Sequence, residues 1–215
     1  VKVVCYNFMP ILDWTRTSLR AKQAHGGAAM LFDLVDFAVF DLHILKREAG
    51  IYDYPVNVLD AALARFSNMT DIAKITLQNN ITAGLPGAND RWSVQDVSTL
   101  LKSYTSITPE RLRTNLIDFL SEVAPVAQSL GLRLCCHPDD PPFSLLGLPR
   151  VMSSSDDYAA VLDAVNLPAN GATLCTGSLG VAESFDGPAF VRRHGPRIHF
   201  AHLRNTKRVV GLDPQ

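Results

Sequence analysis

The chain has 215 residues, of which 47% are hydrophobic and 19% are charged, a composition that supports a substantial buried core. Lys and Arg total 20 and Asp and Glu total 21, so the formal charge of −1 argues against binding to nucleic acid or to an anionic membrane. No apolar run approaches the roughly 18 residues of a membrane span, and residues 1–10 lack the pattern of a signal peptide. We therefore expect a cytoplasmic protein.

The cysteines indicate the same compartment. Four cysteines are few for this length, and they show none of the spacing of a disulfide-rich scaffold. We expect them to be reduced thiols, most of them packed as small hydrophobic residues. They are Cys5, Cys135, Cys136 and Cys175.

The first third of the chain predicts one strand and two long helices. Residues 1–9 alternate and are rich in β-branched residues, which indicates a buried strand that begins at residue 1. Residues 10–29 contain one proline and two glycines and read as a long loop. Apolar residues then recur at helical spacing in residues 31–48 and again in residues 56–78.

Two further helices have clear starting signals. Ser93 with Asp96 three residues later is a plausible capping box, and Thr108 followed by Pro109 and Glu110 begins a helix that Gly131 ends. The second of these helices is expected to bury one apolar face. That face consists of Leu112, Leu116, Phe119, Leu120, Val123 and Val126.

Strands and helices alternate through the remainder of the chain. This order predicts parallel strands joined by helical crossovers, which is the α/β class. The expected elements are a strand at 132–137, a helix near 155–166, a strand at 171–175, a helix near 187–194 and a strand at 197–202.

Each of these last three strands ends on a residue that can bind a metal ion. The residues are His137, Cys175 and His202, and one strand–helix–strand unit separates each from the next. Since active sites of parallel α/β folds lie at this edge of the sheet, the three side chains could converge there. The alternative is that each is a hydrogen-bonded structural residue at its own strand end.

The number of strands bears on the architecture. A closed parallel barrel needs eight strands and about 250 residues. Only four strands are convincing here, and one of them starts at residue 1. The chain therefore reads as the central portion of a larger barrel domain.

Six segments of the chain resemble the mannonate dehydratase family. They are VCYNFMPILDWTRT, ITAGLPGA, CCHPDDPP, LGLPR, NGATLCTGSLG and GPRIHFAHLRN, in that order. The resemblance implies a xylose-isomerase-like (β/α)8 TIM barrel, with residues 1–215 as a single domain that lacks N-terminal and C-terminal strands. It also implies a carbon–oxygen lyase that uses Mn2+ or Fe2+ to convert D-mannonate into 2-keto-3-deoxy-D-gluconate and water in hexuronate catabolism.

The resemblance assigns metal ligands to particular positions. The family binds its metal through His, Cys, His and Asp, and the first three correspond to His137, Cys175 and His202. The aspartate, together with a catalytic Tyr and Arg, is expected beyond Gln215. Imidazole and thiolate donors favour Fe or Zn over Mg or Ca, while the resemblance favours Mn or Fe.

Candidate substrate-binding residues lie in the loops that follow the strands. Arg204 offers a planar pair of donors for a sugar-acid carboxylate, and Asp139 lies in a proline-rich loop suited to a hydroxyl contact or to a supporting carboxylate. The pattern around Arg16 fits a surface ion pair equally well. The complete set is Asn7, Trp14, Arg16, Asp139, Arg204 and Asn205.

Only one of Cys136 and His137 can face the site, because neighbours on a strand point to opposite sides. We assign His137 to the metal and interpret Cys135 and Cys136 as packing residues. The segment GLPGAND lacks the Lys-Ser/Thr pair of a phosphate-binding loop, so we expect no nucleotide binding.

Two alternatives to a dehydratase stay open. One is a metal-dependent sugar isomerase or epimerase of the same fold, and the other is a truncated homologue without activity. The expected ligand is a small sugar acid in every active case, and a homo-oligomer is compatible with each of them.

Overall fold

The computed structural model describes residues 1–83 and 92–208, which divide into two compact units. The first unit comprises Val1–Pro10, Ser106–Ser144 and Pro149–Arg208, and the second contains the described residues of Ile11–Thr105 together with Leu145–Leu148. The expectation of a single domain stays a prediction. The GLPGAND segment, for which no nucleotide binding was expected, lies outside the described residues.

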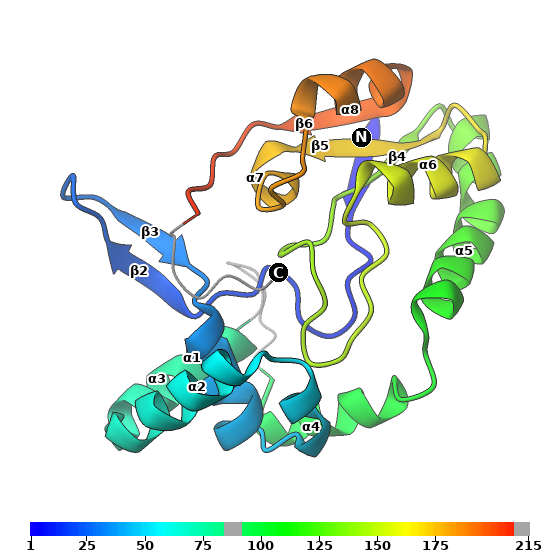
Figure 1. The fold of residues 1–215 in the computed structure, drawn as a ribbon. Helices are drawn as coiled ribbons and strands as arrows, with labels where there is room; N and C mark the ends of the chain where they lie inside the picture. Colours follow the sequence, from blue (N-terminus) through cyan, green and yellow to red (C-terminus); the bar gives the residue numbers. More distant parts are fainter. Residues whose placement is uncertain (84–91, 209–215) are drawn as a thin grey trace. The chain divides into compact units, whose positions relative to one another are not determined.

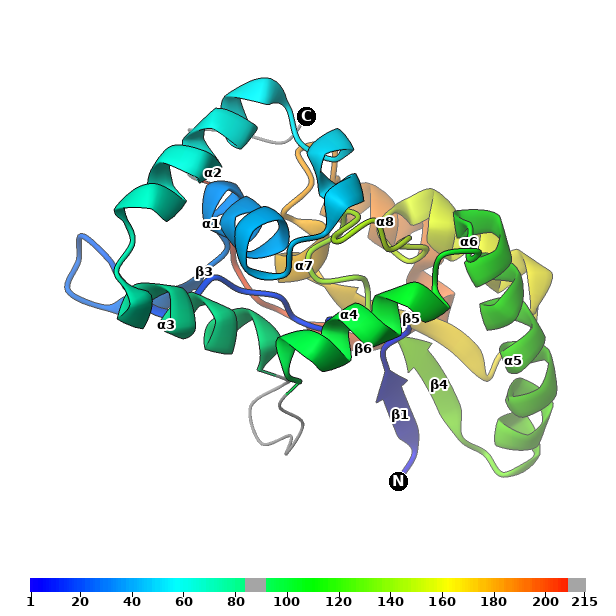
Figure 2. The same ribbon diagram turned by 90° about the horizontal axis from the view of Figure 1, so that it is seen from below.

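A four-stranded parallel sheet forms the centre of the first unit. Its strand order is β1-β4-β5-β6, and every neighbouring pair is parallel. Figure 2 shows β1 beside β4 with both arrows running the same way. The four strands expected from the sequence are confirmed, and so is the α/β class, but β1 is not the buried strand that was expected: Cys5 is exposed, because β1 lies at the edge of this sheet. Their bounds are Val3–Tyr6, Arg133–Cys136, Asn170–Cys175 and Ile198–His202.

Helices cover one face of this sheet (Figure 1). They are α5 (Pro109–Ser129), α6 (Ser155–Ala164) and α8 (Gly187–His194), while the four-residue α7 (Thr176–Leu179) directly follows β5. The apolar core lies between these helices and the sheet. It includes Leu112, Leu116, Leu120, Ala124, Tyr158, Val161, Leu162 and Phe190 from the helices, with Cys136, Ala172 and Leu174 from the sheet.

Helix α5 begins and ends where its sequence signals predict. The Thr108 side chain accepts a hydrogen bond from the Arg111 amide, and Gly131 adopts a φ of +67° after the last turn. The predicted buried face was too wide, however. Phe119 is 49% exposed and Val126 is 57% exposed, because each lies about 80–100° around the helix from the centre of the stripe that contacts the sheet.

Helix α6 is fixed at both its start and its centre. Ser154 and Asp157 form a reciprocal capping box at the first turn. Farther along the helix, the buried Tyr158 hydroxyl donates to the Cys136 carbonyl oxygen at 2.9 Å. The sheet and this helix are therefore joined by a polar contact within the apolar core.

The second unit contains a β-hairpin where a loop was expected. Strands β2 (Ser18–Lys22) and β3 (Ala28–Leu31) pair antiparallel within the range 10–29 and slightly beyond it. The turn is closed by a hydrogen bond from the Gln23 amide to the Gly27 carbonyl, and Gly26 adopts a φ of +86°. The two glycines mark the turn between two strands and not an extended loop.

The predicted helices of the second unit are shorter than expected. The run at 56–78 is broken between Asn68 and Asp71, because Thr70 adopts an extended backbone and caps a new helix through the Ala73 amide. The run at 31–48 contains α1 followed by a π-helical turn. The elements are α1 (Leu34–Val39), η1 (Phe40–Ile44), η2 (Glu48–Tyr52), α2 (Val56–Asn68), α3 (Asp71–Thr82) and α4 (Val94–Ser103).

The capping box predicted for the start of α4 is confirmed. Ser93 and Asp96 exchange side-chain to backbone hydrogen bonds at 2.9 and 3.1 Å. Among the helices of residues 1–83 and 92–208, none combines the length and the hydrophobicity of a membrane-spanning segment.

Candidate metal centre

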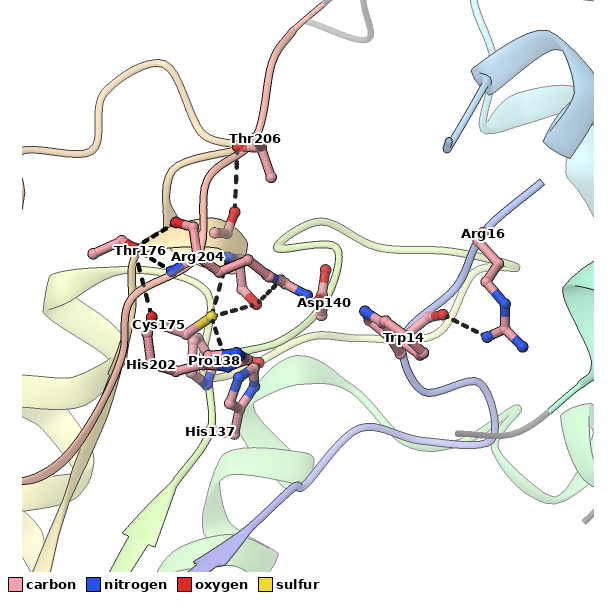
Figure 3. Close-up of polar contacts among 12 residues, drawn as sticks. Trp14, Arg16, His137, Pro138, Asp140, Cys175, Thr176, His202, Arg204 and Thr206 are labelled. Atoms are coloured by element: carbon pink, nitrogen blue, oxygen red, sulfur yellow. Dashed lines mark hydrogen bonds and ion pairs between the residues drawn. The ribbon is translucent and has the colours of Figure 1, made fainter. Parts of the chain in front are cut away.

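Three potential ligands meet at the carboxyl ends of adjacent strands. Cys175 and His202 are the last residues of β5 and β6 and are partners in the sheet register. His137 directly follows β4, and its amide donates to the Tyr6 carbonyl of β1 at 2.7 Å. One nitrogen from each histidine and the Cys175 sulfur all lie within 4.8 Å of one another. Figure 3 shows these side chains together at the strand ends.

The geometry of these atoms suits a divalent transition metal. The Cys175 Sγ lies 3.6 Å from Nδ1 of His202, and the two imidazole centroids are 5.8 Å apart. Ligand atoms around a tetrahedral ion are separated by roughly 3.5 Å, so small side-chain rotations bring all three donors into range. Two nitrogen donors and one sulfur donor suit a transition metal better than Mg2+ or Ca2+, which prefer oxygen ligands.

The protonation of the three groups is adjusted by their surroundings. Burial raises the pKa of Cys175, but hydrogen bonds from His137 and Ser178 outweigh it and lower the pKa from 9.0 to about 7. Burial is the largest single influence on His137 and lowers its pKa, but the hydrogen bond and the charge interaction with Cys175, together with the contact to the Pro138 carbonyl, raise the pKa above its usual value. Burial and the positive charge of Arg204 lower the pKa of His202. A thiolate ligand is thus accessible near neutral pH.

Arg204 lies beside this centre with its charge already compensated. Its Nη2 contacts the Asp140 carboxylate at 2.5 Å and the Ser178 hydroxyl at 2.8 Å. The Thr176 hydroxyl donates to the Arg204 carbonyl at 2.6 Å and accepts from the Arg204 amide at 3.0 Å. The structure therefore places Arg204 near the three ligands, as the sequence predicted, but in an ion pair that the sequence did not reveal.

Asp139 is buried within its loop, a position that fits the supporting carboxylate that was one of the two roles expected of it. The residue is 1% exposed and accepts hydrogen bonds from the Met152 amide at 2.7 Å and the Ser153 hydroxyl at 2.8 Å. Burial raises its pKa, and the positive charge of Arg150 at 4.0 Å opposes that rise. These contacts anchor the proline-rich loop, and a role of Asp139 toward substrate stays a prediction.

The other candidate substrate residues have separate locations. Asn7 and Asn205 are exposed residues of the first unit, and Asn7 contributes to an apolar pocket of about 370 Å³ with Val4, Tyr6, Phe8, Phe119, Val123 and Leu134. Trp14 and Arg16 belong to the second unit, where the guanidinium carbon of Arg16 lies 5.2 Å from the indole ring. Arg16 also donates to the Trp14 carbonyl at 3.2 Å. Their roles toward a substrate stay predictions.

The adjacent cysteines of β4 have the packing roles expected of them. Cys136 is 1% exposed within the apolar core. Cys135 is also buried and is aligned with Cys5 of β1 in the parallel register. A hydrogen bond from Cys135 is the main cause that lowers the pKa of Cys5 to about 6, and Cys5 Sγ also lies 3.2 Å from the Thr173 hydroxyl. Sequence reasoning gave no sign of this thiol pair.

Sequence comparison decides the family. The family model described as D-mannonate dehydratase (UxuA) matches residues 1–212. The chain belongs to the mannonate dehydratase family. It is 51% identical over 208 residues to mannonate dehydratase of Rhizobium meliloti (strain 1021), and the aligned region covers 97% of this chain and 52% of that protein. It is 53% identical over 214 residues to mannonate dehydratase 1 of Agrobacterium fabrum, which covers 100% of this chain and 53% of that protein.

A solved structure agrees with the fold. The crystal structure of mannonate dehydratase from Streptococcus suis serotype2 superposes with a TM-score of 0.62 at 24% sequence identity. The match covers 95% of this chain and 45% of that chain, so it supports the fold alone. The parallel strands with helices on one face are those of a partial TIM-type barrel, as predicted. The chain spans about half the length of the mannonate dehydratases that it matches.

Proposed function

We propose that this chain provides the metal-binding part of a hydro-lyase that removes water from D-mannonate and yields 2-keto-3-deoxy-D-gluconate. The observation that carries the proposal is the convergence of His137, Cys175 and His202 at one sheet edge, within 4.8 Å of one another. Membership of the mannonate dehydratase family selects the reaction among those that such a centre can catalyse.

The donor set supports a divalent transition-metal ion at this centre, and the family resemblance favours Mn or Fe among such ions. His137 and His202 supply imidazole nitrogens, and Cys175 supplies a sulfur whose pKa of about 7 makes the thiolate available. A divalent ion bound there would supply Lewis-acid stabilisation of the negative charge that develops on substrate oxygens. The three side chains would hold the ion at the sheet edge, because Cys175 and His202 end paired strands and His137 directly follows one.

Arg204 is proposed to bind the carboxylate of the sugar acid. Its two side-chain hydrogen bonds to Asp140 and Ser178 both use Nη2, and they hold the guanidinium plane beside Cys175. A carboxylate binds best to a planar, pre-oriented fork of donors. Asp140 keeps this cation in place before substrate arrives, so less conformational entropy is lost on binding.

The test is turnover of D-mannonate by the whole protein that contains these residues, loaded with Mn2+ or Fe2+, with product identified as 2-keto-3-deoxy-D-gluconate. The proposal predicts metal-dependent product formation that Cys175→Ala abolishes. Formation of an isomeric sugar acid would instead indicate an isomerase or epimerase. Metal binding by that whole protein without any product would contradict the assignment of dehydratase activity.

A further inference from the structure

Ser178 makes two contacts with the sulfur of Cys175. The Ser178 amide lies 3.4 Å and its hydroxyl oxygen 3.3 Å from Cys175 Sγ, and both donors are buried. Ser178 itself is 0% exposed, so water does not compete for these groups. Buried donors directed at a thiolate stabilise its charge and fix the direction of its lone pairs.

The same hydroxyl also contacts a cation. Nη2 of Arg204 donates to the Ser178 oxygen at 2.8 Å, and a guanidinium can only donate. The hydroxyl proton is therefore available for the Cys175 sulfur. A hydroxyl that accepts from a cation becomes a stronger donor, because hydrogen bonds in a chain polarise one another.

The position of Arg204 is built into the local sequence. A Cβ at Gly177 would lie 2.2 Å from Nε of Arg204 and 2.8 Å from its Cγ. Any larger residue at this position would therefore collide with the Arg204 side chain. The paired hydrogen bonds with the Thr176 hydroxyl hold the Arg204 backbone. Figure 3 shows Arg204, Thr176 and Cys175 in this arrangement.

We propose that Ser178 is a positioning residue that links the carboxylate-binding Arg204 to the metal-binding sulfur of Cys175. The order of contacts is Asp140, Arg204, Ser178 and Cys175. The inference rests on the metal centre of the proposed function. It adds a route by which a carboxylate bound at Arg204 changes the electron donation of the Cys175 sulfur. Ser178 touches neither substrate nor metal in this scheme, and it acts through the sulfur alone.

The consequence is a measurable change in the bond between sulfur and metal. Loss of the Ser178 hydroxyl leaves the sulfur a stronger electron donor and less well oriented. The charge-transfer band from sulfur to Co(II) should then move to longer wavelength. Affinity for Co(II) should fall about tenfold, as is usual when a partner of a ligand is removed.

The experiment titrates the chain with Co(II) alone and records the near-ultraviolet spectrum of four variants. These are Ser178→Ala, Arg204→Met, the double variant, and Ser155→Ala as a matched serine control. Ser155 bonds to His194 at 2.9 Å, and within residues 1–83 and 92–208 its hydrogen bonds reach none of the three ligands. Ser178→Ala should shift the band most, Arg204→Met should shift it less and in the same direction, and Ser155→Ala should leave it unchanged.

The double variant tests the order of the contacts. If Arg204 acts through Ser178, its replacement adds nothing to the spectrum of Ser178→Ala. Additive shifts would overturn the link, and so would a Ser178→Ala spectrum and affinity equal to those of the original chain. If the original chain shows no sulfur-to-cobalt band, the metal centre of the proposed function fails together with this inference.

Discussion

Cys136 and His137 are consecutive in the chain, but their side chains lie on opposite faces of the sheet. Cys136 is 1% exposed in the core beneath α5 and α6, whereas His137 joins Cys175 and His202 at the strand ends. This follows from the alternation of side chains along a strand. Cys136 is therefore a control for His137 in tests of metal binding, because its thiol packs in the core while the adjacent imidazole lies among the three potential ligands.

Alanine replacement of His137 should empty the metal centre. Three ligands sharing one ion act as a unit, so the loss of one removes most of the affinity and a second loss adds little. Cys136→Ala should keep full occupancy, although it removes buried volume and lowers stability by about 1 kcal/mol. Metal content per chain, measured by elemental analysis after dialysis, distinguishes these outcomes. Full occupancy in His137→Ala would show that the ring is not a ligand.

Metal binding should weaken as the pH falls through 7. The pKa of Cys175 is lowered from 9.0 to about 7 in the folded chain. The folded-state thiolate therefore contributes fully to the free energy of unfolding above pH 9, and this contribution is lost as the pH falls through 7. Below that pH the ion must displace a proton from the thiol, and affinity should fall about tenfold per pH unit from this group alone.

The difference in absorbance at 240 nm between the chain and Cys175→Ala reports this thiolate separately from that of Cys5. We expect a midpoint near pH 7. A midpoint near 9 would mean that His137 and Ser178 do not stabilise the thiolate.

The strand ends illustrate what the sequence predicts well. Parallel strands joined by helices have their carboxyl ends at one edge, so ligands at those ends, such as Cys175 and His202, meet without any detailed knowledge of packing. The sequence also predicts the helix caps at Ser93 and Thr108, because a cap is a contact between residues two or three positions apart.

Other features depend on contacts between distant residues. The hydrogen bond from Arg204 to Ser178 joins the segment after β6 to helix α7 after β5, and only the folded sheet brings these residues together. The one feature of the sequence that accompanies this contact is Gly177, which leaves room for the Arg204 side chain. The sequence alone does not show that Arg204 packs against this glycine. The hairpin at Ser18–Leu31 was missed because Gly26 and Gly27 were read as loop residues and not as a turn.

Asp139→Ala should destabilise the first unit. The Met152 amide and the Ser153 hydroxyl would lose their buried acceptor, and Arg150 would lose its nearby counter-charge. Breaking such a buried charged contact costs about 3 kcal/mol. Chemical denaturation should show this loss, with Asp118→Ala on the exposed surface of α5 as the control that changes little. Equal midpoints for the two variants would rule out an anchoring role.

Arg204→Lys should reduce kcat/KM for D-mannonate. A compact ammonium cannot reproduce a planar fork, and it cannot reach Asp140 and Ser178 with the same geometry. The expected loss is about 1–3 kcal/mol of transition-state binding. Arg193→Lys, at an exposed ion pair with Asp156, is the matched control. Unchanged kinetics in Arg204→Lys would remove Arg204 from the substrate site.

X-ray absorption at the metal edge tests the central claim most directly. We expect one equivalent of Zn2+ bound to the chain to have one sulfur neighbour at about 2.3 Å and two imidazole nitrogens at about 2.0–2.1 Å. The sulfur should disappear in Cys175→Ala and persist in Cys136→Ala. A first shell of nitrogen and oxygen alone in the original chain would contradict a shared centre of His137, Cys175 and His202.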